Sequence, residues 1–315
     1  MRRTSPTLTN YAYYSPRQSK QQPVPSWKAT LGWLVAHRSL FLSKPARFIV
    51  VSALITAGVH GGWTKHVAAQ AAAQKQADHA ALLAAQQKSQ QFGAQVQQLI
   101  AANPGVDVGV SVATSRLGLQ NFGSTKLFDA ASTGKLLTAV TYLNMVEHHR
   151  ASLSDDVAGK SAQQALDTMI IKSDDQSWGA FNTMIGHTAL SAQATTLGIT
   201  DYNADTNSLS AQDIALLLSK LADGTLLTPQ HRQLLLSEMA RANFRDYIVP
   251  AVASPNLVYH KVGIDEDNVH DAAIIKHGDQ WLTLVIYTNG NGQYNWVQRA
   301  QLMQQITQAA QTAYL

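Results

Sequence analysis

Residues 130–140 read Ala-Ala-Ser-Thr-Gly-Lys-Leu-Leu-Thr-Ala-Val and contain the only Ser-x-x-Lys pattern in the 315-residue chain. The apolar run from Leu136 to Val146 predicts a helix. Residues three apart on a helix share a face, so Ser132 and Lys135 are expected side by side at a helix N-terminus. A neighbouring amine activates a serine nucleophile, and N–H groups at a helix start can stabilise an oxyanion. Taken alone, the pattern more often means a helix-capping serine followed by a solvated lysine.

The composition separates a basic tail from an acidic remainder. Residues 1–47 carry eight Lys or Arg and no Asp or Glu. The other 16 Lys or Arg stand against 20 acids, which leaves residues 48–315 with a net charge of about −4. A nucleic-acid-binding domain is expected to carry its basic excess on the fold itself, so no nucleic-acid partner is expected. The absence of cysteine excludes disulfides, zinc thiolate sites and cysteine nucleophiles.

The N-terminal segments predict attachment to a membrane. Residues 1–47 are expected to form a basic, disordered cytoplasmic tail. Residues 48–64 include 16 consecutive residues without an acid, Lys or Arg. As a helix these residues span about 24 Å, short of the ~30 Å hydrocarbon core, but flanking cations can snorkel. Residues 48–64 are therefore predicted to be a transmembrane anchor, and the upstream cations place the remainder of the chain outside the cytoplasm.

Two alternatives stay open for residues 48–64. Small residues follow at 67–73, so the segment could be a cleaved signal peptide with a long basic start. It could also be a buried helix of a soluble protein. Residues 65–92 contain 10 Ala and 7 Gln and no Gly or Pro, which predicts a helical stalk. A coiled-coil partner for this helix is open too, although its sequence lacks sustained Leu or Ile heptads.

Alternating apolar residues predict strands on both sides of a helical block. Residues 106–112 alternate strictly, and residues 117–122 are expected as their hairpin partner. Three further strands are expected at residues 257–262, 272–276 and 281–287. Residues 153–237 are helical in pattern, and a last helix is expected at 297–314. The order predicts an α+β fold, in which one antiparallel sheet from both chain ends is flanked by helices and interrupted by an all-helical insertion.

Two more short motifs follow the Ser-x-x-Lys pattern. Ser173-Asp174-Asp175 begins a helical segment, where a simple N-cap is an equal explanation. Lys261-Val262-Gly263 ends a predicted strand, and its plainer interpretation is a solvated edge-strand lysine. A rival Lys-x-Gly at Lys276 falls on a hairpin turn. The Ser132 helix is expected at the junction of the sheet and the helical block, where clefts usually form.

The order Ser-x-x-Lys, Ser-Asp-x, Lys-x-Gly resembles the penicillin-binding protein and serine β-lactamase superfamily, most closely its class A branch, over residues 93–315. The resemblance implies that Ser132 is the acylated nucleophile and Lys135 the amine that activates it. It also implies that Ser173 relays a proton to the leaving nitrogen, while Lys261 tunes that serine and attracts a substrate carboxylate. The N–H groups of Ser132 and Ile264 would form the oxyanion hole.

The positions that the resemblance places against substrate are Asp175, Val262, Gly263 and Ile264. Two of them depart from the family pattern. Asp175 stands where the family has Asn, and an ionised carboxylate can accept but not donate a hydrogen bond. It could also pair with Lys135 and keep that amine charged. Val262 stands where the family has Thr or Ser, which removes a hydroxyl that would bind a carboxylate.

The loop between the second and third motifs also departs from the family. Class A β-lactamases carry a Glu there that positions the deacylating water, but residues 197–210 contain no Glu. The only acids are Asp201 and Asp205, which fit turn and cap chemistry. The acyl-enzyme is therefore expected to deacylate slowly.

These observations predict a membrane-anchored, extracytoplasmic serine hydrolase that forms an acyl-enzyme with a β-lactam or a D-Ala-D-Ala-like peptide. The first alternative is a catalytically impaired module that binds peptidoglycan or a protein partner. The second is a structural anchor that the module merely caps. No cofactor is expected. A metal site at His260, His270 and His277 is disfavoured, and Trp178 and Phe181 are expected in the core of the helical block.

Overall fold

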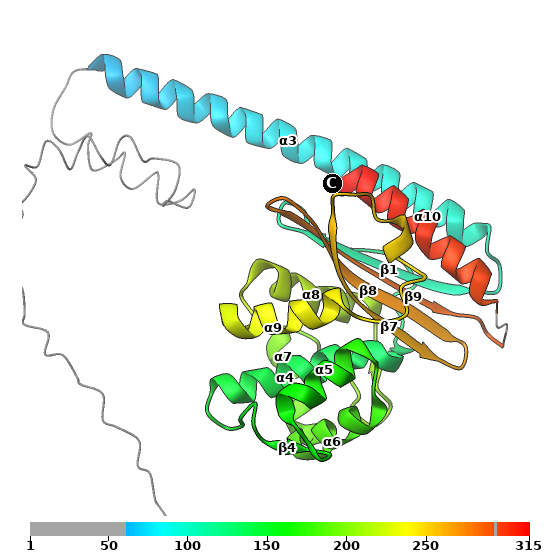
Figure 1. The fold of residues 1–315 in the computed structure, drawn as a ribbon. Helices are drawn as coiled ribbons and strands as arrows, with labels where there is room; N and C mark the ends of the chain where they lie inside the picture. Colours follow the sequence, from blue (N-terminus) through cyan, green and yellow to red (C-terminus); the bar gives the residue numbers. More distant parts are fainter. Residues whose placement is uncertain (1–60, 293–294) are drawn as a thin grey trace, which may run out of the picture. The chain divides into compact units, whose positions relative to one another are not determined.

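The computed structural model describes residues 61–292 and 295–315 (Figure 1). The predicted basic tail lies outside the described residues, and so does the predicted anchor 48–64 except for its last four residues. In the described part of the chain, no helix is both long enough and apolar enough to cross a bilayer. The chain divides into two compact units, residues 1–72 and 73–315. Within the first unit the structure describes only the start of helix α3 (Gly61–Ala101).

The second unit combines a five-stranded sheet with helices on both faces. The sheet strands are β1 (Asp107–Thr114), β2 (Gly118–Gly123), β7 (Leu257–Asp265), β8 (Asn268–His277) and β9 (Gln280–Asn289). The helices that follow β2 are α4 (Lys135–Glu147), α5 (Ala162–Ile171), α6 (Asp175–Ile185), α7 (His187–Leu197), α8 (Ala211–Asp223), α9 (Pro229–Ala240) and α10 (Trp296–Tyr314). Two-stranded pairs are formed by β3 (Phe128–Asp129) with β6 (Ser208–Leu209), and by β4 (Asp156–Val157) with β5 (Lys160–Ser161).

The sheet order is β2-β1-β9-β8-β7, and every neighbouring pair is antiparallel. Strand β1 pairs with β9 along its whole length, from Asp107 opposite Asn289 to Thr114 opposite Leu282. The predicted α+β fold, with a sheet assembled from both ends of the chain around a helical insertion, is therefore confirmed. The strand from Leu257 runs three residues beyond its predicted end at Val262, which brings Asp265 into the sheet.

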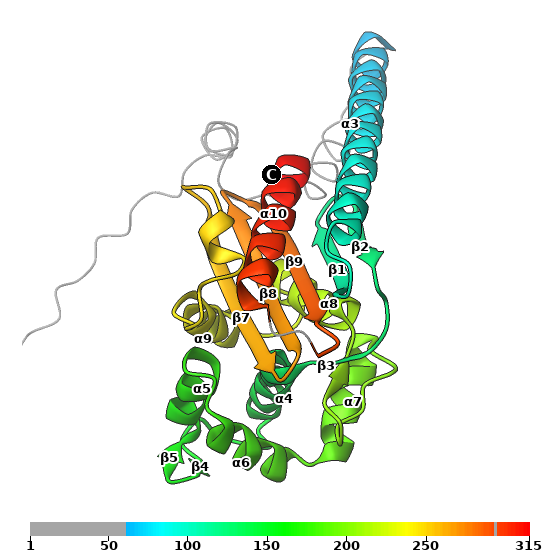
Figure 2. The ribbon, with the colours of Figure 1, turned by 90° about the vertical axis from the view of Figure 1, so that its right-hand side faces the viewer.

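Strand alternation produces a separate core on each face of the sheet (Figures 1 and 2). One core joins the sheet to α10 and the end of α3; its members include Val96, Val108, Val110, Val112, Leu302 and Ile306. The other core joins the sheet to the helical block; its members include Leu136, Val140, Leu166, Phe181, Ile214 and Tyr287. Burial on both faces holds β1, β8 and β9 rigidly between the two helical layers.

Helix α3 runs without a break across residues 92 and 93, where the predicted stalk meets the predicted hydrolase domain. Phe92 is 1% exposed and packs edge-to-face against Phe122 of β2 and Tyr314 of α10. The last turns of α3 therefore belong to the core beneath the sheet, while the predicted boundary itself stays a prediction.

Candidate active site

Ser132 and Lys135 lie where the sheet meets the helical block. Ser132 is in one turn of 3₁₀-helix, η1 (Ala131–Gly134), and Lys135 begins α4. The Lys135 ammonium donates a hydrogen bond to Ser132 Oγ over 2.7 Å. Ser132 is half-buried, the Lys135 side chain is fully buried, and neither η1 nor α4 has a side-chain cap. The plainer interpretation, a capping serine with a solvated lysine, is therefore wrong.

Polar side chains beneath η1 hold the backbone around Ser132. Thr133 Oγ1 donates to the carbonyl oxygen of Ala130 over 2.6 Å and also contacts the Tyr287 hydroxyl. The His270 ring stacks on Tyr287 at 3.9 Å between centroids, and His270 Nε2 lies 2.8 Å from the carbonyl oxygen of Asp129. These contacts hold both ends of the turn that contains Ala131, which has a left-handed backbone with a φ of +46°.

His270 acts in these contacts as a neutral donor. The backbone N–H of Thr288 donates to Nδ1 over 3.1 Å, so the ring proton is on Nε2 and points to the Asp129 carbonyl. Burial lowers the pKa of His270 to about 4, which keeps the ring uncharged at neutral pH. The sequence contained no signal for this role, because it depends on β8 lying beside η1.

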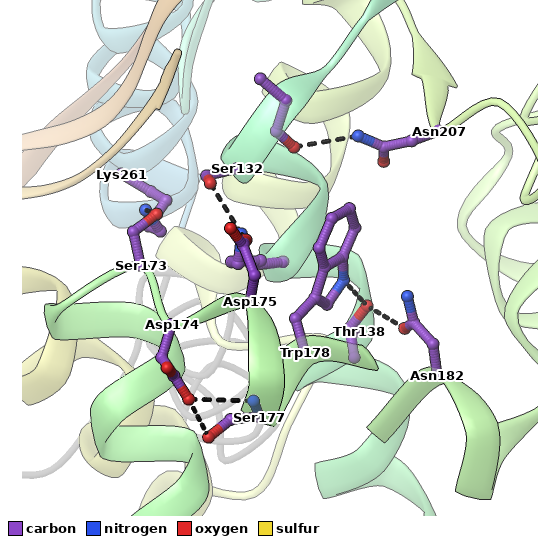
Figure 3. A network of polar contacts seen from close by, with 12 residues as sticks. Ser132, Thr138, Ser173, Asp174, Asp175, Ser177, Trp178, Asn182, Asn207 and Lys261 are labelled. Atoms are coloured by element: carbon purple, nitrogen blue, oxygen red, sulfur yellow. Dashed lines mark hydrogen bonds and ion pairs between the residues drawn. The ribbon is translucent and has the colours of Figure 1, made fainter. Parts of the chain in front are cut away.

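Asn207 holds the other side of the turn that contains Ser132 (Figure 3). Its side-chain amide donates to the Ala131 carbonyl oxygen over 2.9 Å and to Asp129 Oδ1 over 3.2 Å. A Cβ atom at Gly134 would lie 2.1 Å from Asn207 Oδ1, so only glycine fits there. No sequence pattern distinguishes Asn207; the structure places its side chain against η1.

Ser173 and Lys261 form the second pair of the site. The Lys261 ammonium donates to Ser173 Oγ over 2.8 Å and to the Val262 carbonyl oxygen over 2.9 Å. Lys261 is 2% exposed, although β7 is an edge strand, so it is not a solvated edge lysine. Lys276, the rival lysine, is exposed at the end of β8.

The second motif combines a cap with a strained backbone. Asp174 is the N-cap of α6, and its carboxylate accepts from the backbone N–H of Ser177 over 2.9 Å. Ser173, directly before it, has a φ of +62°. A non-glycine residue in this region costs of order 1–3 kcal/mol and is typical of sites where side-chain direction matters. The capping explanation is thus correct for Asp174, and the cap aims Ser173 at Lys261.

Asp175 and Trp178, one turn apart on α6, complete the surroundings of Lys135. Asp175 Oδ1 lies 2.6 Å from Lys135 Nζ, and the Asp175 side chain is 83% exposed. The Lys135 ammonium sits 4.3 Å from the centroid of a Trp178 ring, a cation–π distance. Trp178 was expected in the core. It does pack against the core of the helical block, and it also contacts the Lys135 ammonium.

Burial changes the proton affinity of both lysines. It lowers the pKa of Lys135, and the hydrogen bond and charge of Asp175 oppose this effect. It lowers the pKa of Lys261 to about 7, with a further contribution from the charge of Lys135. Two buried ammonium groups in one site therefore compete for protonation.

Strand β7 passes directly over the turn that contains Ser132. A Cβ atom at Gly263 would lie 2.8 Å from the Ala130 carbonyl oxygen and 3.1 Å from the Ser132 nitrogen. Gly263 therefore permits an approach that no other residue allows. The half-buried Ile264 follows it on the same strand, so the predicted oxyanion-hole partners Ser132 and Ile264 come from two chain segments that touch.

Val262 is placed away from the other site residues. It is 2% exposed and belongs to the core under α10, on the opposite face of β7 from Lys261. Only its backbone carbonyl reaches the site, through Lys261. The histidines of this region also separate: His260 pairs with Asp271 on the α10 face, whereas His270 lies under η1 and His277 is exposed.

The loop at residues 197–210 keeps its acids on the surface. Asp205 Oδ1 pairs with His187 Nδ1 at 2.6 Å, and its side chain is 81% exposed. Asp201 is exposed as well. From this loop, it is the side-chain amide of Asn207, not a carboxylate, that reaches the turn that contains Ser132.

Comparison with known proteins agrees with this geometry. A family model described as the beta-lactamase enzyme family matches residues 91–314. No curated protein matches the chain.

Solved structures share the fold at low sequence identity. PBP-A is 22% identical with a TM-score of 0.64, covering 71% of this chain and 95% of its own. A mutant of PBP-A, solved as an acyl-enzyme complex with penicillin G, has the same identity and TM-score. The beta-lactamase from Sphaerobacter thermophilus is 19% identical with a TM-score of 0.62, covering 69% of this chain and 96% of its own. The beta-lactamase from Burkholderia phymatum is also 19% identical with a TM-score of 0.62, and the alignment covers 70% and 96% of the two chains.

Proposed function

Because the chain belongs to the beta-lactamase enzyme family, we propose that it is a serine hydrolase that forms an acyl-enzyme at Ser132. The substrate class is a β-lactam or a D-Ala-D-Ala-like peptide. One observation carries the proposal: two serine–lysine pairs, at 2.7 Å and 2.8 Å, converge on one site beside η1. A module that only binds has no need of two buried lysines, each held against a serine hydroxyl.

In the acylation step Lys135 accepts the Ser132 hydroxyl proton, and Ser132 Oγ attacks the substrate carbonyl carbon. The lowered pKa of Lys135 supports this role, because a neutral amine is needed at the start. The carbonyl oxygen becomes an oxyanion, which the N–H groups of Ser132 and Ile264 stabilise. The geometry at Gly263 supports this pairing, since it brings β7 against the Ser132 nitrogen.

Collapse of the tetrahedral intermediate breaks the carbonyl carbon–nitrogen bond. Ser173 gives its hydroxyl proton to the leaving nitrogen, and the charged Lys261 replaces that proton through the 2.8 Å hydrogen bond. The acyl group stays on Ser132 Oγ. This route requires Lys261 to be protonated while Lys135 is neutral.

Release of the acyl group is proposed to be slow. The two acids of the 197–210 loop are exposed on the surface, and Asp205 is paired with His187. Neither carboxylate contacts η1 in the described hydrogen bonds and ion pairs, and a carboxylate that activates a deacylating water has to lie there. This arrangement supports a penicillin-binding type of reaction over rapid antibiotic hydrolysis.

The proposed location is the outer face of a cell membrane, with residues 48–64 as a single-pass anchor. Support comes from the sequence: eight cations precede an uncharged segment, and the acidic module follows. Protease added outside intact cells should then degrade the module and spare the N-terminal tail.

The decisive experiment is intact mass of the full chain after incubation with a fluorescent penicillin, beside the Ser132→Ala variant. We expect a one-to-one adduct that the variant lacks and that decays over hours, not seconds. An adduct of equal yield on Ser132→Ala would contradict the assigned nucleophile. If no adduct forms at high ligand concentration, the proposed reaction with β-lactams is wrong.

A second candidate function is a catalytically impaired module that binds peptidoglycan or a protein partner. The contact between Asp175 and Lys135 favours it, because a carboxylate 2.6 Å away holds the proton on the amine. Loss of this contact in Asp175→Asn separates the two functions. Acylation that appears only in the variant would support the impaired module, and acylation in both proteins supports the hydrolase.

A further inference from the structure

We propose that Asp175 makes this site select substrates that carry a positively charged group in the side chain beside the reacting carbonyl. The inference rests on the proposed acylation of Ser132 and adds the charge class of the substrate. The family pattern has an amide at this position, which can accept or donate a hydrogen bond. A carboxylate accepts only, so it favours ammonium groups and amide N–H groups and repels carbonyls and carboxylates.

Asp175 is placed to touch substrate. It is the first residue of α6, and its Oδ1 contacts the ammonium that also holds Ser132 Oγ. Two hydrogen bonds from one nitrogen, of 2.7 Å and 2.6 Å, therefore connect the nucleophile to the Asp175 carboxylate. Its side chain is 83% exposed, whereas that of Lys135 is completely buried. Of this ion pair, the carboxylate is the member that an arriving molecule meets.

A second group of acidic side chains, Asp265, Glu266 and Asp129, lies around the end of β7. Their charge has the same sign as that of Asp175. Lys261, Gly263 and Asp265 alternate along one face of the strand, the face that lies over η1. Burial, a hydrogen bond to the Asp129 carboxyl group and the charges of Asp129, Glu266 and Asp175 all raise the pKa of Asp265. The charge of Asp175 thus contributes to the raised pKa of Asp265. All the charged groups that raise this pKa are acids.

The two ammonium groups of the site already bind groups of the protein itself. Lys135 is paired with Asp175, and the Lys261 ammonium is used by Ser173 and a backbone carbonyl. Val262, at the position where a family hydroxyl would bind a carboxylate, has its side chain in the core on the other face of β7. Relative to the family pattern, the site therefore lacks the anion-binding hydroxyl at position 262. It has a carboxylate instead of an amide at position 175.

Three penicillins that differ in the charge and identity of one substituent, on the side-chain α-carbon, test the proposal. Carbenicillin has a carboxylate on the α-carbon, benzylpenicillin is neutral there, and ampicillin has an amine that is protonated at mildly acidic pH. We expect acylation rate constants to rise in that order at low salt, by about fivefold from benzylpenicillin to ampicillin, in line with a solvent-exposed ion pair. High salt should shrink the ratio, because it screens exposed charges.

Asp175→Asn should make the acylation rate constants of the three penicillins nearly equal. The substitution can change all three rate constants, but the ratios between penicillins are compared within one protein and still report the charge preference. The matched control is Asp279→Asn, which removes the same charge from the exposed turn between β8 and β9 and should leave the ratio unchanged. Equal rate constants in the unsubstituted chain would overturn the proposal. So would a ratio that survives in Asp175→Asn.

Binding of the same three compounds to Ser132→Ala, measured by calorimetry, reads the charge preference without any acylation. If the unsubstituted protein forms no adduct but Ser132→Ala still binds in the predicted order, the hydrolase proposal fails and the charge selection stands. If the three compounds bind equally or not at all, charge selection by Asp175 is wrong even where acylation occurs.

Discussion

At the scale of single residues, two buried lysines have to hold opposite protonation states in the proposed reaction. Lys135 is needed as a neutral base and Lys261 as a charged donor. Burial lowers the pKa of both, and the positive charge of Lys135 lowers the pKa of Lys261 further. The Asp175 carboxylate raises the pKa of Lys135 in opposition to burial. We expect the balance among these three side chains to set the pH range of activity.

The falling limb of the pH profile should report Lys261. Its pKa is lowered to about 7, so the charged form that donates to Ser173 is lost as pH rises through that value. The acylation rate constant is therefore expected to fall above about pH 7. Arginine stays charged throughout, so Lys261→Arg should lose the falling limb. Stopped-flow acylation across pH provides the measurement.

Lys276→Arg is the matched control for this profile, because Lys276 is exposed on the next strand and should keep the limb. We also expect Lys261→Arg to be about tenfold slower below pH 7, since a planar guanidinium does not reproduce the position of the ammonium. A falling limb that is unchanged in Lys261→Arg would show that another group titrates.

At the scale of elements, the start of α6 brings three site groups into place at once. Its cap, Asp174, is flanked by Ser173 and Asp175, and the helix then presents Trp178 to Lys135. The cap is itself held, because Lys160 lies 3.4 Å from the Asp174 carboxylate. Loss of the cap should therefore change both helix stability and the direction of the catalytic side chains.

Asp174→Ala is expected to lower the free energy of unfolding by about 1 kcal/mol, as for other N-caps, and to slow acylation. Asp174→Asn keeps a capping oxygen and should retain most of the stability. Hydrogen bonds from Ser177 lower the pKa of Asp174. Its stabilisation is thus present above the unfolded-state pKa and is lost as pH falls through the folded one. Urea unfolding at neutral and acidic pH measures this; equal stability of the Ala and Asn variants would contradict it.

At the scale of the whole molecule, the two ends of the module close the sheet together. Strand β1 from the N-terminal side pairs with β9 from the C-terminal side, and the ends of α3 and α10 share the core beneath them. Phe92 stands between these segments, in edge-to-face contact with rings of β2 and α10. Strand β7 belongs to the same sheet and contributes residues to the site. The rigidity of the site therefore depends on the pairing of β1 with β9.

Phe92→Ala should lower the free energy of unfolding of the module by about 3 kcal/mol or more, the usual cost of deleting a buried aromatic ring. Leu83→Ala is the matched control: Leu83 is on the same helix but 47% exposed, so its loss should cost less than about 0.5 kcal/mol. Guanidinium unfolding of the full chain, followed by tryptophan fluorescence, compares them. Similar losses for the two variants would show that α3 is only attached to the module and not part of its core.

The sequence by itself determined the order of the elements and indicated which residues meet in the candidate site. Strand alternation and helical periodicity are local properties, so the two strands before the helical block and the three after it could be predicted. The motif spacings are local too, which is why Ser132 and Lys135 were expected to touch. The departures at Asp175 and Val262 were equally visible, because each depends only on residue type.

Only the tertiary structure decided how these pieces act on one another. The contact of Lys261 with Ser173 joins residues 88 positions apart, and the stacked His270 and Tyr287 under η1 come from neighbouring strands whose register the sequence does not reveal. Asn207 lies against η1, and Val262 turned away from the site, because of the direction in which a strand or loop faces. Such directions follow from packing a whole sheet against two helical layers, and no local pattern contains them.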